Sequence, residues 1–329
     1  MEKVRWGLLS TARINRRLIP AIRADQRGEL VAVASRDEAR ARAYAAEWDI
    51  PQAFGSYATM LDSGEIDAAY IGLPNHLHAE WSIRAMEAGV NVLCEKPFAI
   101  TLDEVDVMIA ASRRTGKVLA EAFMYRHHPQ TKILGEWLRS GKLGEILLVR
   151  SAFSFNLDNP GDVRLRPEWG GGALWDIGVY PVSFAQFVMG GAPERVSGAQ
   201  ASSPTGIDET FSGSLVYPGD RQAVIACSFR SPWFNHAEVF GAQGRLVAER
   251  PFSSMDDGKP HLFFYGEDRK AQTIKVPREE LYRGEVADMH AAILDGKPGY
   301  LTLEETRDHV RTVLALYESA RTQQVIRLG

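Results

Sequence analysis

The first 122 residues alternate short apolar runs with segments whose apolar residues recur at helical spacing. The apolar runs predict buried strands, and the intervening segments predict helices that cover them. Strands and helices in this strict alternation form parallel strands joined by crossover helices. Such a sheet binds its ligand beside the carboxyl ends of its strands. The predicted strands are residues 4–9, 30–34, 68–72, 91–94 and 118–122, and the predicted helices are residues 14–24, 38–48, 56–63, 78–88 and 101–115.

Two local signals mark the ends of predicted helices. Thr101 and Glu104 stand at the positions of a capping box, which satisfies backbone N–H groups at a helix start. Gly89 follows the helix predicted over residues 78–88, where a glycine in the left-handed region ends a helix.

After residue 125 the pattern changes to alternating segments separated by turn signals such as Pro218-Gly219-Asp220. This pattern predicts a largely antiparallel sheet that is open on one face. The expected fold is α/β, with a Rossmann-type doubly wound domain over residues 1–123 and an α+β domain over residues 124–329. The predicted strands here are residues 145–155, 195–201, 213–217, 222–229, 237–241, 245–249 and 262–265, and the predicted helices are residues 129–140, 173–189 and 304–322.

Composition excludes several classes of function. The chain has 329 residues, with 38 Lys plus Arg against 42 Asp plus Glu, and this balance argues against a nucleic-acid binder. Cys94 and Cys227 indicate free thiols in a reducing compartment. No run approaches the ~20 apolar residues of a membrane span, and charges interrupt the amino-terminal apolar runs, so no export signal is expected. We therefore expect a cytoplasmic protein without membrane partners.

The loop after the first strand matches a dinucleotide-binding loop only in part. The pattern G-x-G-x-x-G/A would align with residues 10–15, where Ser10 and Ala12 replace glycines and Asn15 takes the third position. Small residues remain, so the backbone can approach a pyrophosphate at a helix N-terminus. The loop residues predicted to contact the cofactor are Ser10, Thr11, Ala12, Arg13 and Ile14.

The end of the second strand favours one form of nicotinamide cofactor. A carboxylate at this point binds a free ribose 2′-hydroxyl, whereas an arginine suits a 2′-phosphate. The sequence here is Ser35-Arg36-Asp37, and the guanidinium of Arg36 matches phosphate oxygens. We expect NADP(H) in preference to NAD(H), although the alternative that Ser35 caps a helix and Arg36 is solvated stays open.

Two further clusters carry candidate chemistry. Lys96, in Glu95-Lys96-Pro97, follows a buried strand at the edge where such a sheet binds its ligand. Asp176 and Tyr180 are four apart, which puts both on one face of a helix. An ammonium beside a phenol favours the phenolate, and such a pair can take a hydroxyl proton as hydride leaves the adjacent carbon.

Over nearly its full length the chain resembles the Gfo/Idh/MocA oxidoreductase family. Within it the chain is most similar to the branch of dimeric dihydrodiol dehydrogenases and NADP-dependent D-xylose dehydrogenases, which have tyrosine at the position of Tyr180. The resemblance is carried by residues 7–14, by Leu73-Pro74-Asn75-His76-Leu77-His78, by Glu95-Lys96-Pro97, by residues 122–126 and by residues 170–180.

The resemblance implies a role for each matched residue. Lys96 would be the catalytic lysine, Tyr180 the acid/base residue and Asp176 its polar partner. Asn75 and His76, after Leu73 and Pro74, would line the nicotinamide–ribose pocket, and Glu95 would contact the ribose or orient the lysine. A sugar or polyol substrate, bound on the open sheet domain, and a homodimer or dimer of dimers through that sheet follow as expectations. The residues predicted to contact substrate are Tyr125, Arg126, Phe155, Arg164, Trp169, Asp176 and Tyr180.

Several alternatives stay open from sequence alone. A ketosugar reductase and a trans-dihydrodiol dehydrogenase use the same fold, and a non-catalytic NAD(P)-binding regulator is a candidate of another class. Such a regulator does not need Lys96, Asp176 and Tyr180 together. His76 and His78 have no third ligand at fitting spacing, so no metal site is predicted, and His78 is interpreted as a residue of a first helical turn.

Overall fold

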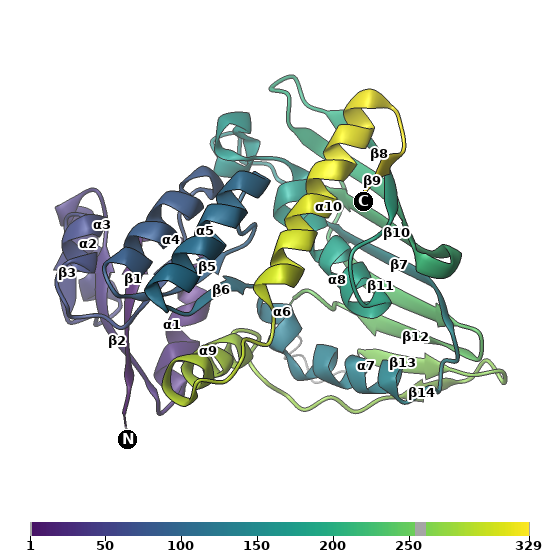
Figure 1. Cartoon of the computed structure of the whole chain (residues 1–329), viewed down its shortest axis with the longest axis horizontal. Coiled ribbons are helices and arrows are strands. Elements are labelled where there is room, and N and C mark those ends of the chain that lie inside the picture. Colours follow the sequence, from purple (N-terminus) through teal and green to yellow (C-terminus); the bar gives the residue numbers. More distant parts are fainter. Residues whose placement is uncertain (1, 254–260, 329) are drawn as a thin grey trace. The chain divides into compact units, whose positions relative to one another are not determined.

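Short apolar segments in the first third of the chain form a parallel sheet in the order β3-β2-β1-β4-β5-β6 (Figure 1). Every residue of β4 and β5 is buried, so these strands need no alternation of apolar and polar residues. The order reverses direction between β1 and β4, as in a doubly wound sheet. The strands are β1 (Val4–Leu9), β2 (Gly28–Ala34), β3 (Gln52–Phe54), β4 (Ala68–Ile71), β5 (Asn91–Glu95) and β6 (Leu119–Ala122).

Helices pack against this sheet as the alternation predicts. Trp6 of β1 donates an indole hydrogen bond of 2.9 Å to His290 of α9. The predicted capping box between Thr101 and Glu104 is confirmed at the start of α5, and Gly89 has the expected positive φ of 85°. The helices are α1 (Asn15–Ala24), α2 (Glu38–Glu47), α3 (Tyr57–Leu61), α4 (His78–Glu87), α5 (Leu102–Thr115), α6 (Met124–His127) and α9 (Arg283–Asp295).

The computed structural model describes residues 2–253 and 261–328, and its contacts divide the chain into two units. The first unit runs to His127 and also contains Tyr282–Thr306, so α9 belongs to the unit of the parallel sheet. The second unit contains His128–Leu281 and the residues from Arg307 onward. The sequence pattern did not indicate that residues 282–306 return to the first unit. The division at residue 123 into a cofactor domain and a substrate domain stays a prediction about function.

The second unit is built on a long sheet in the order β14-β13-β12-β11-β7-β10-β9-β8-β15 (Figure 1). All neighbouring strands are antiparallel except β7 and β10, which are parallel. The predicted open, mostly antiparallel sheet is therefore confirmed. The strands are β7 (Ile146–Ser154), β8 (Arg195–Ser202), β9 (Asp208–Tyr217), β10 (Arg221–Ser228), β11 (Phe234–Gly241), β12 (Gly244–Glu249), β13 (Leu262–Tyr265), β14 (Ala271–Thr273) and β15 (Ile326–Arg327).

One face of this sheet is covered by helices, and its strands alternate accordingly. In β9 and β10 the odd-numbered residues from Phe211 and Ala223 onward are buried against the helices, and most even-numbered residues are exposed. Tyr317 of α10 packs its ring on Phe211 with the centroids 5.7 Å apart. The helices are α7 (Pro129–Arg139), α8 (Val179–Met189) and α10 (Leu303–Thr322), and α10 begins with residues assigned to the first unit.

Some elements differ from the prediction. The helix predicted over residues 173–189 begins with a π-helical turn at Leu174–Gly178 before α8. The elements β3, α6, α9, β14 and β15 were not predicted. Within the part of the chain that the structure describes, no helix is both long and apolar enough to cross a membrane.

Candidate active site

The turn between β1 and α1 is held by polar side chains where the common motif has glycines. Ser10 has a φ of 124°, a region that L-residues rarely occupy. Its hydroxyl donates to the Gly72 carbonyl (2.9 Å) and accepts from the Ala12 N–H (3.2 Å). The backbone carbonyl of Ser10 accepts a hydrogen bond from the side-chain amide of Asn15 at 2.8 Å. These bonds keep a tight turn at a position where a serine replaces a glycine.

The N-terminus of α1 is available to an anion. Its N-cap residue, Ile14, makes no side-chain capping hydrogen bond, and the first turn contains no acidic residue. Gly72 also faces this turn, because an added Cβ would lie 3.3 Å from Ile14 Cγ2. Backbone N–H groups and the positive end of the helix dipole suit a phosphate, so the predicted loop residues fit the pyrophosphate of a dinucleotide.

At the end of β2, Arg36 is exposed, whereas the carboxylate of Asp37 caps the next helix. The Asp37 side chain accepts from the Arg40 N–H (3.1 Å) and caps α2, while buried Ser35 accepts from the Asp37 N–H (3.3 Å). Arg36 is exposed. Burial raises the pKa of the Tyr57 phenol, and the charge of the nearby Arg36 opposes that rise. The residues at this strand end therefore fit a 2′-phosphate better than a 2′-hydroxyl.

Buried carboxyl groups hold the backbone around Lys96. Glu95 accepts hydrogen bonds from the Tyr70 hydroxyl and from the Lys96 N–H, the latter at 3.1 Å. Glu121 accepts from the Phe98 N–H at 3.2 Å, and burial raises its pKa to about 8. The Lys96–Pro97 peptide bond between these contacts is cis. The catalytic candidate therefore lies in a segment whose backbone is fixed on both sides.

The segment after β4 contains the other residues predicted to meet the nicotinamide. Leu73 and Pro74 lead into a 3-10 turn over Asn75–Leu77, and His78 then opens α4 as predicted. The ring of His78 contacts the carbonyls of Leu73 and Pro97. This connection between the segments after β4 and β5 was missed from sequence. A histidine seven residues after β4 was its only signal, and that signal does not name a partner.

In the second unit, Asp176 and Tyr180 lie where the π-helical turn gives way to α8. Asp176 Oδ2 pairs with Arg164 Nε at 2.9 Å, and Arg164 also pairs with Asp162 at 3.3 Å. Asp176 raises the pKa of Arg164, and the nearby Tyr180 phenol acts in the same direction. Asp176 lies in the π-helical turn and Tyr180 in α8, and the prediction that an interval of four places both on one face of a helix stays a prediction. The sequence did not reveal that Arg164 would be the partner of Asp176.

Aromatic packing fixes the ring of Tyr180. This residue is buried, and its ring lies 5.7 Å from that of Phe153 and 5.5 Å from that of Phe252 between centroids. Phe155 and Trp169, both predicted to contact substrate, are half-buried in the same unit.

The start of the helix that carries Asp176 is held by Asp208, which the sequence did not single out. Asp208 is buried and accepts from the Leu174 N–H (2.7 Å) and the Tyr317 hydroxyl (2.7 Å). Burial raises its pKa to about 6 against the effect of these bonds. A carboxylate at a helix N-terminus stabilises the backbone N–H groups of the first turn, which have no hydrogen-bond partner within the helix.

The other two residues predicted to contact substrate lie in the first unit and are occupied by protein contacts. Tyr125 has no exposed surface and packs on Phe123 with ring centroids 5.5 Å apart. Arg126 is also buried, and its guanidinium pairs with Glu305. Their contact with substrate stays a prediction.

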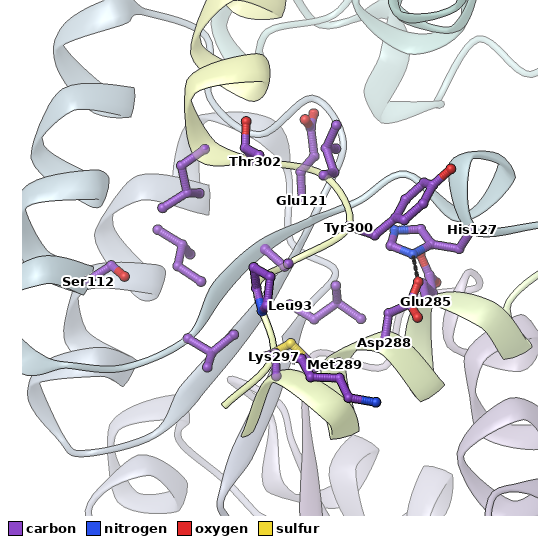
Figure 2. A pocket seen from close by; sticks show the side chains of 18 of the residues that line it. Leu93, Ser112, Glu121, His127, Glu285, Asp288, Met289, Lys297, Tyr300 and Thr302 are labelled. Carbon is purple, nitrogen blue, oxygen red and sulfur yellow. Dashed lines mark hydrogen bonds and ion pairs between the residues drawn. The ribbon is translucent and has the colours of Figure 1, made fainter. Parts of the chain in front are cut away.

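A separate cavity of about 350 Å³ lies in the first unit between β5, β6 and the chain around α9 (Figure 2). His127 pairs there with Asp288 at 2.6 Å, and the ring of Tyr300 lies beside that of His127. None of the residues predicted to bind cofactor lines this cavity. Across residues 2–253 and 261–328, no group of three His, Cys, Asp or Glu side chains could hold a metal ion.

Comparison with known proteins gives the family. The model of the oxidoreductase family with the NAD-binding Rossmann fold matches residues 4–123, and that of the GFO/IDH/MocA C-terminal domain matches residues 132–247. The chain therefore belongs to the Gfo/Idh/MocA oxidoreductase family, as predicted. It is a nicotinamide-dependent oxidoreductase whose relatives act on sugar-like CH–OH groups.

Among similar proteins is D-xylose 1-dehydrogenase (NADP(+)) 2 of Haloferax volcanii, which is 38% identical over 326 residues, 98% of this chain and 99% of the relative. Trans-1,2-dihydrobenzene-1,2-diol dehydrogenase of Bos taurus is 35% identical, covering 73% of this chain and 72% of the relative. Among solved structures is KijD10, a 3-ketoreductase from Actinomadura kijaniata in complex with NADP and TDP-benzene. Its TM-score is 0.90 at 29% identity, over 97% of this chain and 98% of that one.

Proposed function

We propose that this protein is an NADP(H)-dependent oxidoreductase that transfers hydride between the nicotinamide and a carbinol carbon of a sugar or polyol, as an aldose 1-dehydrogenase does. The observation that carries the proposal is Lys96, placed directly after β5 in a segment held by Glu95 and Glu121. The full-length similarity to a D-xylose dehydrogenase supports the substrate class.

The cofactor preference rests on the strand ends. The uncapped N-terminus of α1 would receive the pyrophosphate, and exposed Arg36 would bind the 2′-phosphate. Leu73, Pro74, Asn75 and His76 would lie along the nicotinamide and its ribose. When bound, the nicotinamide accepts or supplies the hydride.

The chain's own residues would handle the proton and the oxygen. In the oxidative direction the substrate hydroxyl gives its proton to Tyr180, and the carbon–hydrogen bond breaks with its electron pair leaving as hydride. Lys96 holds the oxygen as its charge develops. Asp176, already paired with Arg164, acts as the polar partner of Tyr180.

Two related functions have an observation in their favour. Similarity to a 3-ketoreductase supports a ketosugar reductase, and the positive charges of the exposed residues Arg164 and Arg166 suit a substrate that carries phosphates. Similarity to the dihydrodiol dehydrogenase supports a hydroaromatic diol as substrate, with Phe155 and Trp169 as apolar contacts.

The test is a screen of NADP⁺ and NAD⁺ against aldoses, inositols and a hydroaromatic diol, followed by absorbance of the reduced nicotinamide. We expect turnover of an aldose with NADP⁺, and a loss of at least about 10²-fold in kcat for both Lys96→Ala and Tyr180→Phe. Turnover in the Lys96→Ala variant at the wild-type rate would contradict the proposal. Cofactor binding without turnover of any compound would favour a ketosugar reductase or a regulator. A strong preference for NAD⁺ would contradict the role of Arg36.

We further propose that the open face of the second sheet binds a second copy of the chain. Val224 and Phe234, on β10 and β11, are 44% and 50% exposed on the face opposite the helices. These apolar side chains lie on a sheet face that no helix among the described residues covers, and this supports a subunit contact there. Light scattering after gel filtration should give at least a dimer mass, reduced to that of one chain by Val224→Asp. A wild type with the mass of one chain would contradict the proposal.

A further inference from the structure

His78 lies between two backbone carbonyls at the edge of the first sheet. It is the first residue of α4 and has no exposed surface. Its Nδ1 is 2.8 Å from the Pro97 carbonyl oxygen and its Nε2 is 2.9 Å from the Leu73 carbonyl oxygen. Leu73 follows β4 and Pro97 follows β5, and these two strands are neighbours in the sheet. The ring therefore joins two segments that are 24 residues apart along the chain.

Both carbonyls are acceptors, which restricts what the ring can do. A neutral imidazole has one N–H, so each tautomer donates to only one of the two oxygens. Burial, with smaller contributions from the charges of Lys96 and His76, lowers the pKa of His78 to about 4. The ring is therefore neutral at pH 7. With hydrogen on Nδ1 it holds Pro97, and with hydrogen on Nε2 it holds Leu73.

The two segments it joins have different tasks in the proposed function. The Pro97 carbonyl belongs to the residue directly after Lys96, whose own N–H is held by Glu95. The Leu73 carbonyl lies at the start of the segment with Asn75 and His76, proposed to contact the nicotinamide and its ribose.

We propose that His78 is a positioning residue of the active site, whose neutral ring donates from Nδ1 to the Lys96–Pro97 segment in one tautomer and from Nε2 to the Leu73–His76 segment in the other. The proposal rests on the proposed function, because it assigns the first contact to the position of Lys96 and the second to cofactor affinity. Ser10 supports it from the neighbouring strand, since its hydroxyl holds the Gly72 carbonyl at 2.9 Å. The side chains of Ser10 and His78 thus contact the segments after β1, β4 and β5.

Two amide substitutions separate the two contacts. In His78→Asn the amide nitrogen occupies about the position of Nδ1, so it can still donate to Pro97 but not to Leu73. In His78→Gln the amide nitrogen occupies about the position of Nε2, so it can still donate to Leu73 but not to Pro97. If His78 were only a core residue, the two substitutions would have similar effects on kcat and on NADPH affinity.

His290 is the matched control. It lies in the same unit, is equally devoid of exposed surface, and accepts the indole N–H of Trp6 at its Nε2. Its other nitrogen lies 3.3 Å from Asp25, so its contacts do not involve the predicted cofactor residues. His290→Gln should lower the melting temperature. It should not lower kcat or NADPH affinity selectively, with the other quantity unchanged.

The experiment measures NADPH affinity by nucleotide fluorescence and measures kcat with the aldose identified above. For His78→Asn we expect NADPH affinity to fall about tenfold while kcat stays within about threefold of wild type. For His78→Gln we expect kcat to fall about tenfold or more while NADPH affinity stays within about threefold.

Equal effects of the two substitutions on both quantities, no effect on either, or the pattern of His290→Gln would overturn the proposal. So would failure of both variants to fold, because His78 would then be needed for the core itself. A wild type that binds NADPH without turning over any sugar would contradict the proposed function alone, since unequal NADPH affinities of the two variants would still support the Leu73 contact. A wild type that binds no NADPH would contradict both.

Discussion

Lys96 in the first unit follows a strand, whereas Asp176 and Tyr180 in the second unit lie on a helix, and the two units fix these residues by different means. Around Lys96, the side chains of Glu95, His78 and Glu121 bind successive backbone groups. In the second unit, one carboxylate, that of Asp208, holds the start of the helix.

The difference shows where this fold can vary. The backbone around Lys96 is bound by buried groups from several elements, which suits a cofactor that does not change. In the second unit, Arg164 and Trp169 come from a largely exposed loop, although Arg164 contacts Asp176 directly. Such a loop can change its side chains without disturbing the core, which suits a substrate that differs between relatives.

The largest effect should come from Gly172→Ala, which displaces the Asp208 carboxylate that holds the start of the helix. Gly172 has a φ of 131°, and an added Cβ would lie 2.1 Å from Asp208 Oδ1. Strain and displacement of the buried carboxylate together should lower the free energy of unfolding by at least about 3 kcal/mol. Urea unfolding measures this loss.

Gly191→Ala is the control for that prediction. Gly191 has a φ of 148° in the same unit, with no atom within 4 Å of an added Cβ. It should cost only the backbone strain, about 1–2 kcal/mol. Equal losses for the two substitutions would mean that contact with Asp208 does not matter.

The next prediction contrasts the pH dependence of the two supports. The pKa of Asp208 is raised from 3.8 to about 6, so the folded state binds the extra proton and its stability falls as pH rises through this window. The pKa of His78 is lowered from 6.5 to about 4, so stability falls as pH drops through its window. Each change is on the order of 3 kcal/mol and opposite in sign.

Because the two changes oppose each other, each needs its own difference curve. Unfolding free energies from pH 4 to pH 7 should show wild type losing stability relative to Asp208→Asn as pH rises. Relative to His78→Asn, wild type should lose stability as pH falls. Two curves with the same slope would refute the assignment of one of these groups.

The smallest effect expected on stability is that of Arg164→Lys. The Arg164 side chain is 43% exposed, so its ion pair with Asp176 should contribute no more than about 1 kcal/mol to folding. Lysine keeps the charge but loses the Nε contact with Asp176, so kcat/KM should fall about tenfold. Arg113→Lys, at the exposed pair with Glu304, is the control and should leave kcat/KM unchanged. A kcat/KM for Arg164→Lys equal to that of the control would show that Arg164 does not contribute to the active site.

Much of the fold could be predicted because its signals are local. Buried strands such as β4 are apolar runs, and Thr101 and Gly89 mark helix ends through contacts within a few residues. α9 was missed because its buried positions include Glu285 and His290, so no apolar stripe marks it. β14 was missed because all its residues are exposed.

The sequence by itself determined the alternation of strands and helices, and with it the strand ends where Ser10, Arg36 and Lys96 stand. Local periodicity is sufficient for that, because strand ends meet at one edge of any parallel sheet. Only the tertiary structure decided that His78 contacts both Leu73 and Pro97, that Arg164 pairs with Asp176, and that Asp208 holds the start of their helix. Periodicity does not reveal these contacts, because the partner of a buried polar group depends on which segments the completed fold brings together.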